Sequence, residues 1–196
     1  MLSQQQSSAL LEEYAKGAIW SKHCFAVAQA ALRVGSVLNE FRSIDLEFLW
    51  SAALLHDIGR YRTHDPIKHG VEGYHLLTKL GHHQEAFVCA SHILFGLDAA
   101  EAELAGLPAR DFIPNSIEEQ LIPLVDFMIE FDEPTTLDER FASLRKRNSN
   151  NSYFMDRLDR AEHTAKALLV RLNREIGQSI EGIVASNKDR IDADLN

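Results

Sequence analysis

Apolar residues recur every three or four positions along most of the chain, and this spacing predicts helices. Glycines, prolines and short polar runs separate the apolar stretches and indicate where each helix ends. The helices expected from this pattern cover residues 10–14, 19–34, 45–58, 69–80, 85–95, 99–104, 116–128, 137–144 and 154–184. No convincing series of alternating apolar and polar residues predicts a sheet. The expected fold class is therefore all-α, a helical bundle with a long C-terminal helix.

The third of these helices is strongly apolar, and it leads into an adjacent His56-Asp57 pair followed by Gly59. Glycine adopts the left-handed conformation that ends a helix, so we expect Gly59 to terminate it and the pair to lie in its last turn. An unpaired carboxylate buried there would cost several kcal/mol. A metal ion bound by both side chains removes that cost, and Asp57 has two oxygens with which to bridge two ions. The alternative is a helix end in which the pair forms its own hydrogen bond.

Four more side chains of metal-ligating type occupy positions with apolar neighbours or open a helix, namely His23, His69, His92 and Asp126. The resulting set of four imidazoles and two carboxylates suits one or two divalent transition-metal ions (Fe, Mn, Co, Ni or Zn), and two are favoured. The expected sharing puts Asp57 between two groups of ligands, which are His23, His56 and Asp126 on one ion and His69 and His92 on the other. Each ligand has an alternative role. His23 could be a core histidine bonded to a carbonyl, Asp126 could form an ion pair, and His69 and His92 could support a single ion without binding it.

Three cations are expected to face this site, and they are Arg60, Lys68 and Arg110. We expect Asp57, Arg60 and Lys68 to act in catalysis and all three cations to bind substrate, because guanidinium and ammonium groups bind phosphate oxygens. The alternative for each cation is a surface salt bridge of small energetic value. Residues 97–114, which contain Arg110, are expected to form a lid or wall over the pocket. His64, His75, His82 and His83 are expected to be solvated, with His64 close enough in sequence to line the entrance.

Composition narrows the class of protein. The 196 residues are 45% hydrophobic and 25% charged, which is typical of a globular protein. We expect a domain over residues 1–145, a polar loop over 145–152, and a helical extension over 153–196 that packs on the core or on a second subunit, so a homodimer is possible. The aspartates between residues 189 and 194 are expected to belong to a solvated tail.

Net charge is −9 and the isoelectric point is about 5.4, so no basic surface is expected for duplex nucleic acid. No segment approaches the roughly 18 apolar residues of a membrane span, and the N-terminus is polar. Cys24 and Cys89 have no CxxC spacing and are expected to be reduced core thiols. These features favour a cytoplasmic protein with no membrane partner.

The order His23, His56-Asp57 and Asp126 resembles that of the HD-domain metal-dependent phosphohydrolases, and His69 and His92 resemble the subset with a two-metal centre. Three strings are similar to a small family of uncharacterised HD-domain hydrolases of the HDIG type best represented in archaea, namely HDIGR at 56–60, HGVEG at 69–73 and AEAELAGLPARDFIP at 100–114. Dinucleoside polyphosphate hydrolases share the ligand order more loosely. The resemblance covers roughly residues 19–140. Pro123 departs from the family in the helix that presents Asp126, and Arg60 stands where several HD phosphodiesterases have lysine.

This resemblance implies a phosphohydrolase for a small nucleotide or related phosphate ester, in which metal-activated water attacks phosphorus. A second possibility is a di-iron HD-type oxygenase that cleaves a carbon–phosphorus or carbon–carbon bond in a small phosphonate or polyol. A third is a non-catalytic nucleotide sensor that signals through the C-terminal helix. Oxygen uptake and metal-replete turnover are the measurements that separate these three functions.

Overall fold

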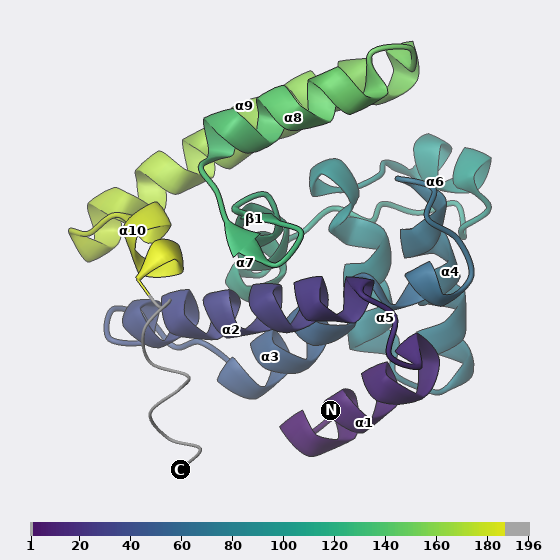
Figure 1. Cartoon of the computed structure of the whole chain (residues 1–196), viewed down its shortest axis with the longest axis horizontal. Coiled ribbons are helices and arrows are strands. Elements are labelled where there is room, and N and C mark those ends of the chain that lie inside the picture. Colours follow the sequence, from purple (N-terminus) through teal and green to yellow (C-terminus); the bar gives the residue numbers. More distant parts are fainter. Residues whose placement is uncertain (1, 187–196) are drawn as a thin grey trace.

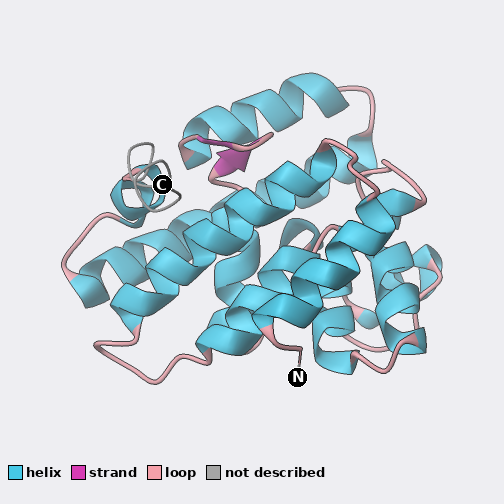
Figure 2. Cartoon of the chain, turned by 60° about the horizontal axis from the view of Figure 1, so that its bottom comes forward, coloured by secondary structure: helices cyan, strands magenta, loops and turns pink. Residues whose placement is uncertain are grey.

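The structure is a computed structural model, and it describes residues 2–186 as a bundle of helices (Figure 1). The helices and strands, in chain order, are α1 (Gln4–Ala15), α2 (Trp20–Leu38), α3 (Leu46–Leu55), the 3-10 helix η1 (Ile58–Tyr61), α4 (Lys68–Lys79), α5 (His83–Ser91), the 3-10 helix η2 (Ile93–Phe95), α6 (Ala99–Ala105), α7 (Ile117–Asp126), β1 (Ile129–Glu130), β2 (Glu133–Pro134), α8 (Leu137–Asn148), α9 (Ser152–Ile176) and α10 (Ile180–Ala185). The all-α prediction is confirmed, although the small β1–β2 hairpin was not expected (Figure 2). None of the described helices has the length and apolar character needed to cross a membrane.

α2 and α3 pack against each other through small side chains. A Cβ atom at Gly35 of α2 would lie 2.4 Å from the Cδ2 atom of Leu49 on α3, so the leucine side chain packs directly on the backbone of α2. The imidazole rings of His23, in the first turn of α2, and His56, just after α3, lie with centroids 5.4 Å apart. The two helices are therefore antiparallel, and their packing brings the two imidazoles together.

α4 and α5 form a second pair of the same kind. A Cβ atom at Gly70 would lie 2.3 Å from the carbonyl oxygen of Cys89, which shows how closely the two backbones approach. His69 opens α4 and His92 follows α5, and their ring centroids are 5.2 Å apart. Both cysteines are buried and unpaired with each other, as free thiols.

Gly59 serves a different purpose from the predicted one. α3 ends at Leu55, His56 caps it, and Asp57 precedes η1, so the pair follows the helix rather than forming its last turn. Gly59 lies inside η1 and is not among the residues with positive φ, so the prediction of a left-handed helix end was wrong. The glycine is required instead by close packing, since a Cβ atom there would lie 1.8 Å from the carbonyl oxygen of His69.

The C-terminal part differs from the prediction at two places. α8 continues to Asn148, so much of the expected polar loop is helical. α9 ends at Ile176 because Gly177 adopts the left-handed conformation with φ of +68°, and α10 is a separate helix, so the single helix predicted over 154–184 was wrong. α8 and α9 lie side by side along one edge of the molecule (Figure 1), and the apolar face of α9 packs on the core. The predicted Asp-rich tail at 189–194 lies outside the described residues.

Residues 97–114 form a small unit beside α4 and α5. A bridge joins Leu97 to Phe112, whose backbone groups exchange hydrogen bonds of 3.1 and 2.8 Å. Phe112 packs against Tyr74 of α4 and Phe87 of α5 in a separate small core. The segment is therefore held on the outer side of the α4–α5 pair.

Candidate metal centre

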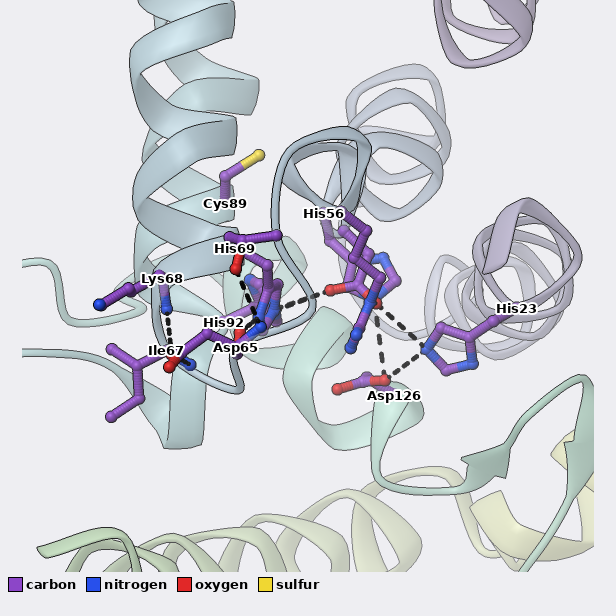
Figure 3. A network of polar contacts seen from close by, with 12 residues as sticks. His23, His56, Asp65, Ile67, Lys68, His69, Cys89, His92 and Asp126 are labelled. Carbon is purple, nitrogen blue, oxygen red and sulfur yellow. Dashed lines mark hydrogen bonds and ion pairs between the residues drawn. The ribbon is translucent and has the colours of Figure 1, made fainter. Parts of the chain in front are cut away.

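Six side chains from separate parts of the sequence meet at one point of the bundle (Figure 3). They are the six that the sequence analysis selected as metal ligands, namely His23, His56, Asp57, His69, His92 and Asp126. The α2–α3 pair brings one pair of imidazoles, the α4–α5 pair brings the other, and Asp57 lies between them. Asp126, the last residue of α7, completes the group. His56, Asp57, His69 and His92 are almost fully buried.

The four imidazoles are fixed in the same way. In each ring Nδ1 lies within hydrogen-bond distance of a backbone carbonyl oxygen, at 2.7 Å for His23 with Phe131, 2.7 Å for His56 with Ala53, 2.8 Å for His69 with Asp65 and 3.2 Å for His92 with Val88. Because a carbonyl only accepts, Nδ1 carries the hydrogen in the neutral ring, and Nε2 presents a lone pair. The backbone therefore sets both the tautomer and the orientation that metal-binding histidines need.

Asp57 lies between the two imidazole pairs with one oxygen toward each. Its Oδ1 atom is 2.9 Å from Nε2 of His69 and 3.5 Å from Nε2 of His92. Its Oδ2 atom is 3.8 Å from Nε2 of His56 and 3.9 Å from Nε2 of His23. The Oδ1 atom of Asp126 is 2.9 Å from Nε2 of His23 and 3.7 Å from Nε2 of His56. The carboxylate of Asp57 is thus placed to bridge two groups of donors.

Two features of this cluster suit a cation. The Nε2 atom of His56 is buried and has no hydrogen-bond partner among the described residues. The Nε2 atoms of His69 and His92 are 3.1 Å apart, and with both Nδ1 hydrogens directed at carbonyls two lone pairs face each other. That contact is unfavourable unless a positive charge lies near both nitrogens. Imidazole and carboxylate donors in this number suit a divalent transition metal, so the cluster fits such an ion.

The charges of the cluster also suit metal binding. Burial alone would raise the pKa of Asp57, but His69, His56 and Arg60 hold that pKa well below its usual value. Burial opposes ionisation of Asp126 too, yet its hydrogen bond with His23 and the charges of His23 and His56 keep the pKa of its carboxyl well below normal. Burial lowers the pKa of His69, which favours the neutral ring. Ionised carboxylates and a neutral imidazole are the forms that bind metals.

The structure brings one of the three selected cations to the centre. Arg60 donates from Nε to Oδ2 of Asp57 in a short hydrogen bond. Lys68 is exposed, and its side chain points away from the imidazoles (Figure 3). Arg110 is exposed on the 97–114 segment, where its guanidinium carbon lies 4.8 Å from the centroid of the Phe112 ring.

Two cavities adjoin the cluster. The smaller, about 90 Å³, is lined by Asp57, Arg60, His69 and His92 among others, and the larger, about 800 Å³, opens beside His23 and is lined also by His64. Arg60 and Arg140 line both. No residue of 97–114 lines either cavity, so that segment is not the lid or wall expected from the sequence. The reason is that Phe112 anchors it to the outer side of α4 and α5.

Among the cavity residues that sequence reasoning missed are Arg140, Arg147 and Phe131. Both arginines lie on α8 seven residues apart, which places them on one face of that helix. That spacing was a usable signal, but the second arginine fell in a stretch interpreted as a polar loop. Phe131 lies in the unexpected hairpin, and its short sequence carries no comparable signal.

Comparisons with known proteins agree with this geometry. A family model described as HD domain matches residues 20–194. A protein of Methanocaldococcus jannaschii, described as uncharacterised, is 33% identical over 162 residues, which cover 82% of this chain and 89% of that protein. Two proteins named tRNA (cytidine(56)-2'-O)-methyltransferase, from Picrophilus torridus and Thermoplasma volcanium, are 26% and 29% identical over 67% and 89% of this chain. The matches span 37% and 48% of those two proteins, and no solved structure matches.

The family match covers most of the chain and includes all six converging side chains. The archaeal relative matches over most of both chains at 33% identity. On these two findings, the chain belongs to the HD-domain family.

Proposed function

We propose that this protein is a metal-dependent phosphohydrolase that acts on a small nucleotide or related phosphate ester. The observation that carries the proposal is the position of Asp57, whose two oxygens face two separate pairs of imidazole Nε2 atoms. HD-domain proteins are in general metal-dependent hydrolases, and this arrangement supplies ligands for a metal. We propose two ions, with Asp57 between them.

The ligands would be His23, His56, Asp57 and Asp126 on one side and Asp57, His69 and His92 on the other. Divalent ions bound there supply Lewis acidity toward phosphoryl oxygens and lower the pKa of water. Arg60 lines both cavities and would orient a non-bridging phosphoryl oxygen, since its guanidinium has further donors besides the Nε–H given to Asp57. Asp57 holds that guanidinium in place and raises its pKa, although burial alone would lower it.

Lys68 and Arg110 carry less of this proposal. Lys68 points away from the centre, and its backbone N–H donates to Oδ1 of Asp65 at the start of α4. Its proposed part in catalysis would require the exposed side chain to turn toward the substrate. Arg110 would require movement of the whole 97–114 segment, so we assign substrate binding first to Arg60.

Histidine-rich ligation also suits iron, and this observation favours an HD-type di-iron oxygenase as the second candidate. Its substrate would be a small phosphonate or polyol. Oxygen consumption that starts on addition of such a substrate to the iron-loaded protein would favour this candidate over hydrolysis. Turnover that proceeds equally in anaerobic buffer would exclude it.

The proposed partners follow from the charge and the fold. With a net charge of −9, we propose small phosphorylated molecules rather than duplex nucleic acid or membranes, a cytoplasmic location and the possibility of a homodimer. The methyltransferase activity named for two relatives is not part of the proposal, because this chain matches less than half of each.

The decisive experiment compares Asp57→Ala with wild type. Both are assayed for release of phosphate from a panel of phosphorylated metabolites, with Mn, Co, Ni and Fe in turn, and their bound metal is measured by elemental analysis. Because Asp57 faces both donor groups, the variant is expected to lose metal and turnover together. Asp159→Ala is the control, because it removes an exposed carboxylate that lines neither cavity. Asp159 forms an ion pair with Arg145, and both residues are far in sequence from the imidazoles. Full turnover by Asp57→Ala, or no hydrolysis of any panel member by wild type, contradicts the proposal.

A further inference from the structure

The larger cavity extends from the metal centre toward α8 and the β1–β2 hairpin. Its volume is about 800 Å³, far more than one phosphoryl group occupies. His23 and Arg60 lie at the end that adjoins the imidazole cluster, and Arg140 and Arg147 of α8 line another part. The cavity therefore has room for an organic group attached to a phosphate held at the centre.

The α8 side of this cavity presents two guanidinium groups. Arg140 and Arg147 both donate to one oxygen of Glu130, over 3.3 and 2.9 Å, and Ser143 donates to the same oxygen over 2.6 Å. Each of these two arginine bonds uses one of the five N–H donors of its guanidinium. The Nε atom of Arg140 is buried and has no hydrogen-bond partner among the described residues. An anion in the cavity would find guanidinium donors here.

Like charges crowd Arg147 in particular. Burial, together with the charges of Arg140 and Arg60, lowers the pKa of its guanidinium despite the presence of Glu130. Two acidic residues of the hairpin, Asp132 and Glu133, also line the cavity and are exposed, as Arg147 is. The side chain of Arg140 is 13% exposed and that of Arg147 is 44% exposed, so Arg140 is the donor better shielded from water.

Part of the remaining wall is apolar. Ile19 and Phe131 are 80% and 74% exposed, and Trp20 and Pro134 line the cavity with them. Large exposed apolar side chains around a cavity indicate a surface that binds a ligand. Phe131 is held in a left-handed conformation, with φ of +59°, and its carbonyl oxygen accepts the Nδ1–H of His23. The apolar wall is thus tied to the metal centre.

We propose that Arg140 and Arg147 form a subsite for a second anionic group of the substrate, which is an organic phosphate ester bearing a carboxylate or another phosphate at the far end of an apolar body. The inference rests on the proposed hydrolysis of phosphate esters and adds the substrate class. The scissile phosphate lies at Arg60, the apolar body contacts Trp20 and Phe131, and the second anion accepts hydrogen bonds from the α8 arginines.

Phosphonates test this subsite without turnover, because a carbon–phosphorus bond replaces the ester bond. Alkylphosphonates with two to six methylene groups are compared with phosphonoalkanoates of equal length, which add a terminal carboxylate. Dissociation constants are measured by calorimetry on the full-length, manganese-loaded protein. At the best chain length, the phosphonoalkanoate is expected to bind wild type about tenfold more tightly than its matched alkylphosphonate. A gain of this size is what one charge-assisted hydrogen-bonded pair contributes.

Arg147→Gln is the test variant, because this side chain is partly exposed and its loss leaves the core intact. The tenfold preference is expected to fall to less than twofold. Lys146→Gln is the matched control, since it removes the same charge from the adjacent exposed residue, which does not line the cavity, and it should keep the preference. Equal melting temperatures of the variants establish that both are folded.

The outcomes separate this inference from the function on which it rests. If alkylphosphonates bind but no chain length gains more than twofold from the carboxylate, the subsite is refuted and the phosphate site stands. If Arg147→Gln keeps the full preference, the α8 arginines are not the anion subsite. If no phosphonate binds at millimolar concentration, the proposed function fails and the subsite fails with it.

Discussion

Replacing Gly59 by alanine tests how the backbone packing supports the metal centre. An added Cβ atom would lie 1.8 Å from the carbonyl oxygen of His69 and 2.5 Å from the backbone nitrogen of Gly73. Both atoms belong to the backbone of α4, so no change of side-chain rotamer relieves the contact, and α4 has to move by about 1 Å. Overpacking costs roughly 1–3 kcal/mol, and displacement of a helix puts the expected loss at the upper end, about 3 kcal/mol.

The assay is urea unfolding of the metal-free protein, followed by thermal unfolding. For a chain of this length each kcal/mol lowers the melting temperature by about 2–4 °C, so we expect a decrease of about 6–12 °C. Because α4 carries His69, whose Nε2 atom lies 2.9 Å from Asp57, weaker metal binding should accompany the loss of stability.

Gly182→Ala is the matched control for this substitution. A Cβ atom at Gly182 meets only the side chain of Ser179, at 3.5 Å or more, inside α10. Alanine in a helix is about 1 kcal/mol more favourable than glycine, so this variant should equal or exceed wild type in stability. If Gly59→Ala unfolds at the same urea concentration as wild type, the close approach of η1 and α4 is not a constraint and the reasoning is wrong.

Two further predictions concern pH and metal removal. Burial alone would raise the pKa of Glu101, but hydrogen bonds from Arg157 and Arg160 lower that pKa to about 2. The ionised Glu101 therefore stabilises the fold above its ordinary pKa of 4.5, and this stabilisation is lost as the pH falls toward 2. The difference in unfolding free energy between wild type and Glu101→Gln should therefore shrink by on the order of 2 kcal/mol between pH 6 and pH 2.5. A difference that stays constant with pH would contradict this prediction, and so would an equal pH-dependent change for the exposed control Glu103→Gln. Removing a metal present at 100 times its dissociation constant should cost wild type about 2.7 kcal/mol of stability, and Asp57→Ala should show no such loss on chelation.

Much of the fold could be predicted from the sequence, because helical periodicity depends on local positions. The helices that contain His69 and Asp126 end within a few residues of their expected limits. The helix expected to run to Val184 ends at Ile176 instead, since the left-handed Gly177 stops it even though the apolar pattern continues. The spacing of apolar residues predicts which face of a helix is buried. It does not predict whether that helix continues without a break.

The candidate site shows a similar division. The converging imidazole and carboxylate side chains could be selected from the sequence as candidate ligands, because such groups are costly to bury without a partner. The role of Gly59 could not, since it depends on the distance to His69 ten residues later in the chain. Nor could the location of Arg110, because only the packing of Phe112 between Tyr74 and Phe87 shows on which side of α4 and α5 its segment lies.

The arrangement of the six side chains would give a bound metal a structural role as well as a chemical one. One imidazole pair belongs to α2 and α3, the other belongs to α4 and α5, and Asp57 lies in the connection between these helix pairs. The carbonyl groups that fix each Nδ1 belong to the same segments, apart from that of Phe131. Each helix pair therefore presents imidazole nitrogens toward the other, with Nε2 of His69 and Nε2 of His92 only 3.1 Å apart. A metal ion bound by both pairs would link the two halves of the bundle.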